Sequence, residues 1–346
     1  MVGCGFVTMD RHLPAVRHVP DVAVVALVDT EPERAAELAA RLAPKARAAS
    51  LEEVLGDPTV EALAVCTPPA SHLDVALAGL DAGKHLLVEK PISASLEDAD
   101  RLIAAAAQSG ARVMVGFNLR RHRLVERARR VLRAGRLGTV QALRTAFTSP
   151  ILDGAVDWQG RRSLGGGALL DRAVHHFDLW RFLLGTEIVE VSALTQSRRG
   201  DDQSAVITAR AADGLLVTTL VLDDSAVSQD LAIYGTDGAV FVDCCRVDGF
   251  HLAPRREPPG SLRSRLRRAR ESLEHPSETV QAIRRGGDFR VGFEEQWRHF
   301  AHAIREGIEP SPSLADGRAA MEIAVAAARS ADSGLPVGLR ELQVAS

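Results

Sequence analysis

The first third of the chain alternates apolar runs with amphipathic helical patterns. Residues Val22–Val28 are continuously apolar, as expected for a strand that is covered on both faces. Residues Glu31–Leu42 follow with helical spacing of apolar positions. Strands that alternate with helices in this way indicate a parallel sheet with right-handed crossovers. Further strands are expected at Glu61–Cys66, His85–Val88 and Arg112–Val115, and further helices at Ala70–Ala82 and from Ser93 or Ser95 to Ser109.

The second half of the chain has a different pattern. Several runs alternate apolar and polar residues and are joined by turns such as Gly235–Gly238, which is typical of an antiparallel sheet. Strands are expected at Thr139–Phe147, Ile188–Leu194, Ala205–Ala211, Leu215–Leu222, Leu231–Tyr234 and Ala239–Val242. Helices are expected at Asp171–Leu184, Glu294–Arg305 and Asp316–Ala331. The change of pattern near Gly116–Arg123 predicts two domains, at residues 1–118 and 119–346.

Composition narrows the classes of protein to consider. A chain of 346 residues is long enough for two domains with full hydrophobic cores. The net charge of −3 gives no general reason to expect nucleic acid as a partner. The four cysteines have neither zinc-ligand spacing nor a disulfide pattern, so we expect reduced thiols and a cytoplasmic protein. We find no apolar run of about 18 residues and no secretory signal, and we expect no membrane association.

A glycine-rich loop opens the chain. In Gly3–Thr8 the first glycine permits a tight turn, and Gly5 lets the backbone approach a pyrophosphate at the start of a helix. Asp29 follows at the end of the next strand, where an acid would bind the adenosine ribose and favour NAD over NADP. Arg34 lies close enough in sequence to leave NADP possible, and Asp29 could instead cap the helix that follows Thr30.

Only Met1 and Val2 precede this loop, whereas a first strand of about five residues should lead into it. One hypothesis is that the native start lies upstream of Met1. Comparing the folding and cofactor affinity of a protein extended upstream would test it, and equal stability and affinity would contradict it.

Three further motifs follow in a fixed order. They are Thr67–His72, directly after a predicted strand, Gly83–Pro91, which contains Glu-Lys-Pro, and Gly165–His175, which contains Asp-x-x-x-His. Together they resemble the Gfo/Idh/MocA family of sugar and polyol dehydrogenases. The resemblance extends over essentially the whole chain apart from residues near 253–288. It implies an N-terminal Rossmann domain with a doubly wound parallel sheet, followed by an α+β domain with a large open, mainly antiparallel sheet.

The resemblance also implies chemistry that the residue types support. Lys90 ends a strand at the carboxyl edge, where ligands bind in such sheets. Asp171 and His175 are four residues apart, on one face of an α-helix, so the carboxylate can orient the imidazole. Hydride transfer at an alcohol carbon requires a base for the hydroxyl proton, and histidine titrates near pH 7. The sequence leaves open which of Lys90 and His175 takes the proton.

The remaining predicted contacts fall into two groups. The cofactor is expected at Gly3, Cys4, Gly5, Phe6, Val7, Asp29, Thr30, Thr67, Pro68, His72, Glu89 and Lys90. The substrate is expected at Asn118, Arg120, Trp158, Asp171, His175 and His176, although His72, Trp158 and His176 could equally be packing residues. No metal is expected, because His299 and His302 lack a clear third ligand.

Three functions fit these motifs. The first is NAD(P)-dependent oxidation or reduction of a sugar, a polyol or a sugar derivative. A glycosidase of the same fold would regenerate NAD, and a regulator that only senses the dinucleotide would have lost the catalytic groups, all of which are present. The arginine-rich segment 255–270 is predicted to be a solvated loop and a short helix, or else a site for an anionic substrate or an acidic surface. We expect a homodimer or homotetramer formed through the open sheet.

Overall fold

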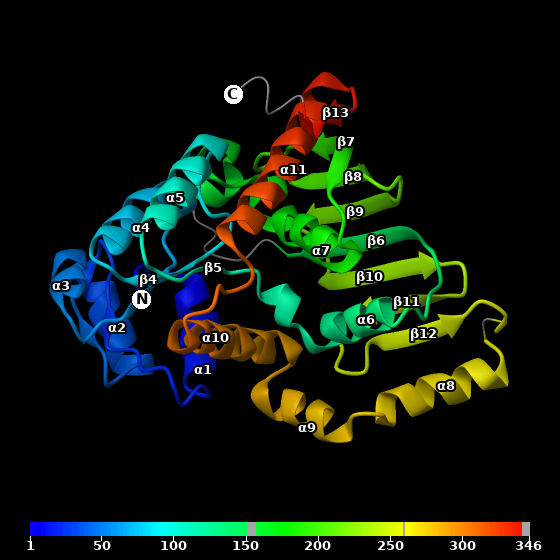
Figure 1. The fold of residues 1–346 in the computed structure, drawn as a ribbon, viewed down its shortest axis with the longest axis horizontal. Helices are drawn as coiled ribbons and strands as arrows, with labels where there is room; N and C mark the ends of the chain where they lie inside the picture. The colour runs from blue at the N-terminus through cyan, green and yellow to red at the C-terminus, as the bar shows by residue number, and fades with distance from the viewer. Residues whose placement is uncertain (151–156, 259, 341–346) are drawn as a thin grey trace. The chain divides into compact units, whose positions relative to one another are not determined.

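The computed structural model describes residues 1–150, 157–258 and 260–340. The chain divides into two compact units, whose elements are labelled in Figure 1. The first unit contains Met1–Asn118, Arg161–Gly166 and Phe293–Met321. The second contains Leu119–Gly160, Gly167–Gly292 and Glu322–Ser346.

The first unit is built on parallel strands, as the alternating pattern predicts. Strands β3, β4 and β5 pair in that order, and β1 pairs with β2. Val2 forms parallel bridges to both Val28 and Val65, so it connects the two groups of strands into one sheet. The bounds are β1 (Ala26–Leu27), β2 (Arg47–Ala48), β3 (Ala62–Val65), β4 (His85–Val88) and β5 (Val113–Val115).

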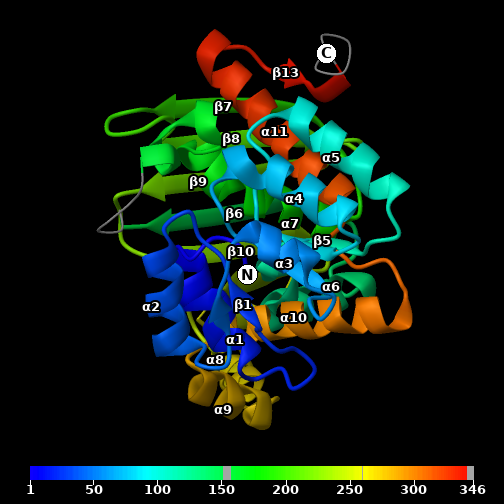
Figure 2. The same ribbon diagram turned by 90° about the vertical axis from the view of Figure 1, so that its left-hand side faces the viewer.

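Two helices of the first unit begin at capping residues that lie within a few positions of the helix start. In α5 the Ser95 hydroxyl accepts a hydrogen bond from the Asp98 backbone N–H, so of the two predicted starts, Ser93 and Ser95, the helix begins after Ser95. Helix α3 was not predicted, although Ser50 and Glu53 form a complete capping box at its start. Helix α4 packs on β4 and against α5 (Figure 2). The bounds are α2 (Pro32–Leu42), α3 (Leu51–Gly56), α4 (His72–Asp81) and α5 (Leu96–Gln108).

The helix after the glycine loop is irregular. Residues Thr8–His12 form a π-helical turn, η1, which continues into α1 (Leu13–Val16). Pro14 explains the irregularity, because it has no N–H for the carbonyl four residues earlier and its ring would clash with that carbonyl. The apolar side of this helix packs in a core to which Phe293, Trp297 and Phe300 of α10 (Asp288–Glu306) also belong.

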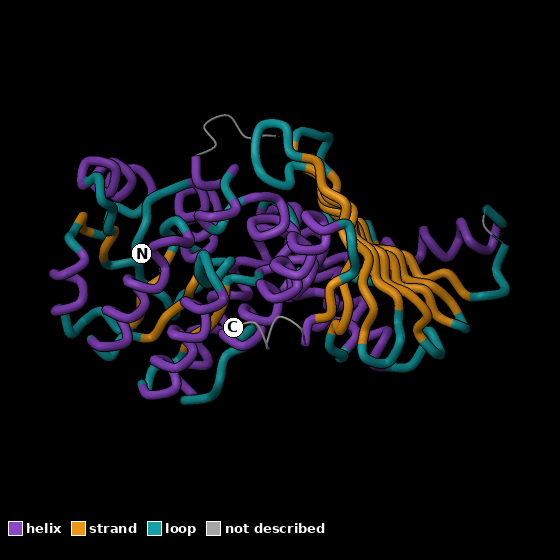
Figure 3. The backbone as a smooth tube through the Cα atoms, turned by 90° about the horizontal axis from the view of Figure 1, so that it is seen from above, coloured by secondary structure: helices purple, strands orange, loops and turns teal. Residues whose placement is uncertain are grey.

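The second unit contains one eight-stranded sheet, in the order β12-β11-β10-β6-β9-β8-β7-β13. Figure 3 shows its strands side by side in orange. All neighbours are antiparallel except β6 and β9, which confirms a mainly antiparallel sheet. The bounds are β6 (Val140–Ser149), β7 (Ile188–Gln196), β8 (Ser204–Ala211), β9 (Leu216–Asp223), β10 (Ser228–Gly235), β11 (Gly238–Asp243), β12 (Phe250–Pro254) and β13 (Val337–Gly338).

Helix α7 covers one face of this sheet, and the indole N–H of Trp180 donates to the Thr145 hydroxyl of β6 at 3.3 Å. The helices that lie wholly in the second unit are α6 (Arg123–Arg133), α7 (Val174–Leu184), α8 (Leu262–Leu273) and α9 (Pro276–Arg285), and α11 (Leu314–Ser333) belongs to it from Glu322 onward. The segment predicted as a solvated loop and short helix therefore contains a full helix, α8, followed by α9. Pro259, in the predicted loop before α8, lies outside the described residues.

Two predicted elements differ from the structure. The strand expected at Val22–Val28 is limited to Ala26–Leu27, which pair with the two residues of β2, and Val28 next to them forms a bridge to Val2. The helix expected from Asp171 is α-helical only from Val174. Residues Ala168–Ala173 instead form a π-helical turn, η6. The α-helical spacing assumed for Asp171 and His175 therefore does not hold over this stretch.

Candidate active site

The glycine loop of the first unit has the geometry of a phosphate-binding turn. Gly3 has φ +91°, and a Cβ there would lie 2.6 Å from the carbonyl oxygen of Cys66, so only glycine fits. At Gly5, in contrast, no atom lies within 4 Å of an added Cβ. The chain is thus packed tightly below the first glycine and open at the second, where a pyrophosphate would approach the backbone.

Thr8 occupies the third position of the motif, where glycine or alanine is usual. Its hydroxyl donates to the Gly3 carbonyl at 2.6 Å, and the residue is fully buried. The threonine therefore links the last residue of the glycine motif to the first. Phe6 is half exposed beside Arg11, whose guanidinium lies 5.6 Å from the ring centroid, and Val7 is partly buried.

Asp29 connects the loop to the end of the second strand segment. Its Oδ2 accepts from the Cys4 backbone N–H at 2.8 Å, and its Oδ1 accepts from the Glu31 N–H at 3.0 Å. Arg34 lies 3.7 Å from Oδ1, and Thr30 is exposed next to it. Each carboxylate oxygen has about two acceptor positions, and Oδ2 uses one of them for the Cys4 N–H, so this oxygen has capacity for a ribose hydroxyl.

A second group of loop residues follows β3 and β4. The ring of His72 lies between two backbone carbonyls, with Nδ1 2.9 Å from Pro91 O and Nε2 2.7 Å from Thr67 O. His72 therefore fixes the segment after β3 relative to Pro91. The Thr67 hydroxyl oxygen is buried and has no hydrogen-bond partner among the described residues. An unsatisfied hydroxyl beside exposed Pro68 fits the predicted cofactor contact.

Glu89 belongs to a buried network that the sequence did not suggest. Its Oε1 lies 2.9 Å from His12 Nε2, and its Oε2 accepts from the Lys90 backbone N–H at 3.2 Å. The indole N–H of Trp297 donates to His12 Nδ1 at 3.1 Å. Because an indole can only donate, Nδ1 holds the lone pair, and the His12 proton is on Nε2 and faces Glu89.

This network positions the lysine. Burial would raise the pKa of Glu89, but the hydrogen bond from His12 and the nearby Lys90 charge bring the pKa below its usual value, which keeps the carboxylate ionised. Lys90 itself is half-buried, and Asn118, at the end of the first segment of this unit, is buried. No local sequence signal identifies His12 or Trp297, which are 285 residues apart.

The second unit holds the remaining predicted residues. Asp171 is buried in η6, His175 is half-buried in α7, and Gly167 begins the turn with φ +75°. Arg172 Nε lies 3.4 Å from the Asp171 carboxylate and 3.3 Å from that of Asp223. A π-helical turn widens the helix at this motif, and such turns are frequent at functional sites.

Arg120 and Trp158 lie in different settings. The Arg120 guanidinium donates through Nε and Nη2 to both oxygens of Asp178, and both residues are buried. The ring of Phe182 lies 4.9 Å from the guanidinium. This ion pair accounts for the burial of Arg120, whose predicted contact with substrate stays a prediction. Trp158 is half-buried in η4 (Asp157–Gly160).

Comparison with known proteins identifies the architecture. Residues 1–117 match the family described as oxidoreductase family, NAD-binding Rossmann fold, and residues 125–241 match the GFO/IDH/MocA C-terminal domain. The chain belongs to the Gfo/Idh/MocA family. Its first domain is the family's NAD-binding Rossmann domain, and the glycine loop, Asp29 and Thr67 described above are compatible with that cofactor.

Several known proteins are similar to this chain over most of their length. Myo-inositol 2-dehydrogenase of Thermotoga maritima is 26% identical over 345 residues, covering 96% of this chain and 95% of the relative. Levoglucosan dehydrogenase of Pseudarthrobacter phenanthrenivorans is 26% identical, covering 84% and 83%. The crystal structure of GenD2 from gentamicin A biosynthesis in complex with NAD is 27% identical, with a TM-score of 0.80 and coverage of 97% and 94%.

No group of three or more His, Cys, Asp and Glu side chains in the described parts of this family member is arranged to hold a metal ion. None of its described helices is long and apolar enough to cross a membrane.

His176, a predicted substrate contact, is buried, and neither ring nitrogen has a hydrogen-bond partner within the described chain. Burial lowers its pKa from 6.5 to about 4. Between these values the unfolded chain binds the extra proton, so the free energy of unfolding should fall as the pH is lowered from 6.5 to 4. At about 1.4 kcal/mol per unit of pKa difference, the full loss is about 3 kcal/mol.

The measurement is urea unfolding at several pH values for the wild type and for His176→Leu. The variant should lose this part of the pH dependence, whereas His302→Gln, at an exposed histidine, should keep it. Parallel pH profiles for wild type and His176→Leu would show that the ring has a hydrogen-bonding role that offsets its burial.

Proposed function

We propose that the protein transfers a hydride between NAD and a hydroxyl or carbonyl carbon of a sugar, polyol or sugar derivative. The observation that carries this proposal is a lysine held by a buried network, in a domain whose glycine loop leaves its second glycine open. The family and its sugar- and polyol-oxidising members support the substrate class.

Each residue has a defined task in this proposal. When bound, NAD accepts or supplies the hydride. The Lys90 ammonium binds the substrate oxygen and stabilises negative charge on it as its proton leaves. His175 accepts the hydroxyl proton during oxidation and returns it during reduction. Asp171, with the Arg172 guanidinium beside its carboxylate, orients the His175 imidazole. The His12–Glu89 contact holds the Lys90 backbone in place.

Cofactor preference tests the dinucleotide half of the proposal. NADH and NADPH would be titrated separately by nicotinamide fluorescence, and NADH should bind more tightly because Asp29 repels a 2′-phosphate. Gly5→Val should unfold at the same urea concentration as wild type, since an added Cβ meets no atom within 4 Å, but should lose NADH binding. NADH affinity unchanged in Gly5→Val would exclude this loop as the pyrophosphate site.

We propose that a second copy of the chain covers the open face of the second unit's sheet. Leu194, Val206 and Leu220 occupy paired positions across β7, β8 and β9, and they are 75%, 47% and 36% exposed. A row of exposed apolar side chains is typical of an interface. Sedimentation should give a dimer or tetramer at micromolar concentration, and Leu194→Lys with Val206→Lys should shift it towards monomer. A wild-type monomer would contradict this.

We also propose a cytoplasmic location. All four cysteines are free, including the neighbouring Cys244 and Cys245, which is compatible with a reducing compartment.

A further inference from the structure

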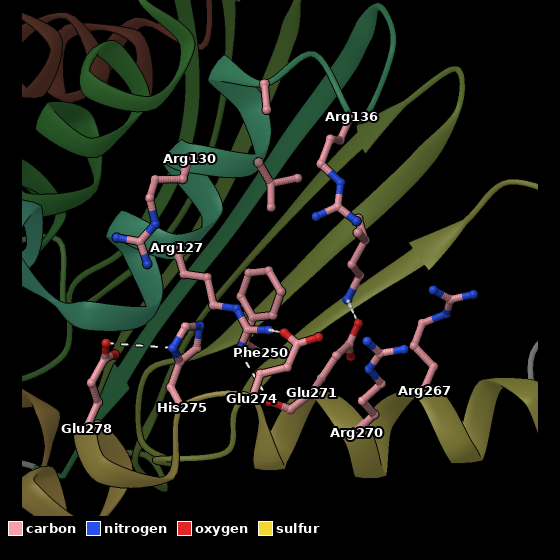
Figure 4. A pocket seen from close by; sticks show the side chains of 13 residues that line it. Arg127, Arg130, Arg136, Phe250, Arg267, Arg270, Glu271, Glu274, His275 and Glu278 are labelled. Atoms are coloured by element: carbon pink, nitrogen blue, oxygen red, sulfur yellow. Dashed lines mark hydrogen bonds and ion pairs between the residues drawn. The ribbon is translucent and has the colours of Figure 1, made fainter.

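A cavity of about 730 Å³ lies in the second unit, and its lining includes no residue assigned above to hydride transfer. It is lined by α6 and the turn after it, by β12, and by α8 and α9 (Figure 4). Its volume is within the range of sites for small molecules. Five arginines and three glutamates line it, so its character depends on which of these charges are already paired.

All three glutamates have partners. Glu271 accepts from the Leu252 backbone N–H at 3.2 Å and lies 2.9 Å from His251 Nδ1. Glu274 accepts from Arg127. Glu278 lies 3.7 Å from His275 Nδ1, as the dashed line in Figure 4 shows. The acidic side chains are therefore used within the wall of the cavity.

Two of the arginines are also fixed. Arg127 pairs with Glu274, and its guanidinium stacks 4.0 Å from the centroid of Phe250. Arg267 donates through Nε and Nη2 to Glu257, at 3.0 and 2.7 Å. These contacts hold the charged side chains of the wall in place. Less side-chain freedom is therefore lost when a ligand binds.

The other three arginines are not engaged in this way. Within the described parts of the chain, the side chains of Arg130, Arg136 and Arg270 have neither a hydrogen-bond nor an ion-pair partner. They come from α6, the turn after it and α8, so three separate segments line the cavity with arginine side chains (Figure 4). A bound anion would offset the repulsion between these like charges.

We propose that this cavity binds a small organic polyphosphate through Arg130, Arg136 and Arg270. Guanidinium groups pair bidentately with phosphate oxygens, and three of them from different segments match two or three linked phosphoryl groups better than a single one. A cavity of this volume also has room for the organic part of such a molecule. The inference does not rest on the proposed hydride transfer, because it uses none of the same residues.

The test uses inorganic tripolyphosphate and orthophosphate as probes, in calorimetric titrations of NADH-saturated protein at 0.15 M salt, about physiological ionic strength. NADH occupies the glycine loop, so that loop cannot supply the signal. One equivalent of tripolyphosphate should bind, at least about tenfold more tightly than orthophosphate. Binding should persist in Gly5→Val, which separates this result from any failure of the cofactor site.

The matched variants remove equal charge from the same two helices. Arg130→Gln with Arg270→Gln removes two cavity arginines, and the affinity for tripolyphosphate should fall about 100-fold. Arg133→Gln with Arg265→Gln removes two exposed arginines that do not line the cavity, and the affinity should change less than about twofold. Unfolding midpoints of both variants should match wild type, since all four side chains are exposed.

Three results would overturn the proposal. One is the absence of tripolyphosphate binding at millimolar concentration. Another is equal weakening in the two double variants, which would mean attraction to overall surface charge. The third is equal affinity for orthophosphate and tripolyphosphate, which would mean a site for a single anion.

Discussion

His175→Ala and Lys90→Met should each reduce the turnover number by about 10³-fold while the protein still binds NADH. The expected reduction follows from the loss of a positioned proton acceptor or of an oxygen-binding cation. Each of these groups typically accelerates a reaction by about 10²–10⁴-fold. Methionine keeps the length and unbranched shape of the lysine, so the backbone contact from Lys90 N–H to Glu89 remains. The measurement is steady-state reduction of NAD with a sugar or polyol substrate, alongside NADH titration.

The matched controls are His302→Ala and Lys45→Met, which change an exposed histidine and an exposed lysine. Both should keep wild-type turnover. The two active-site losses should also be far from additive, because Lys90 and His175 are proposed to act on the same substrate hydroxyl. Wild-type turnover in either active-site variant would refute its role, and lost NADH binding would mean that the side chain serves the cofactor instead.

Asp178→Ala should lower the free energy of unfolding by about 3–5 kcal/mol, because it leaves the Arg120 guanidinium buried without its carboxylate. Arg120 Nε donates to Asp178 Oδ2 at 2.8 Å, and the two side chains are only 7% and 1% exposed. The loss should be larger than for most single substitutions, since replacing one partner of a buried pair costs more than replacing both. Urea unfolding measures it.

Two further variants serve as controls for Asp178→Ala. Glu187→Gln removes the ion-pair partner of Arg181, which lies on the same helix as Asp178. Because the Glu187 carboxylate is 65% exposed, the expected loss of stability is about 0–1 kcal/mol. The double variant Arg120→Met with Asp178→Leu should recover most of the stability, because it leaves no buried charge. Equal losses in Asp178→Ala and Glu187→Gln would mean that water reaches the buried pair.

Elements whose cause lies within a few residues could be predicted. Strand β4 was predicted with its bounds, and α5 was predicted to begin at Ser93 or Ser95, because burial pattern and capping are local properties. The π-helical turns η1 and η6 could not be, since their apolar spacing resembles that of an α-helix. For the same reason the spacing of Asp171 and His175 suggested a regular helix face that the structure does not have.

The same distinction between local and long-range causes applies to the candidate active site. By itself the sequence determined that Gly3 opens a tight glycine turn, that Lys90 follows a strand, and that Asp171 and His175 share one motif, because each depends on local spacing. Only the tertiary structure decided that Trp297 joins the network of His12 and Glu89, and that Arg120 pairs with Asp178. Only packing brings together residues so far apart in sequence, and packing depends on the whole chain rather than on any short segment of it.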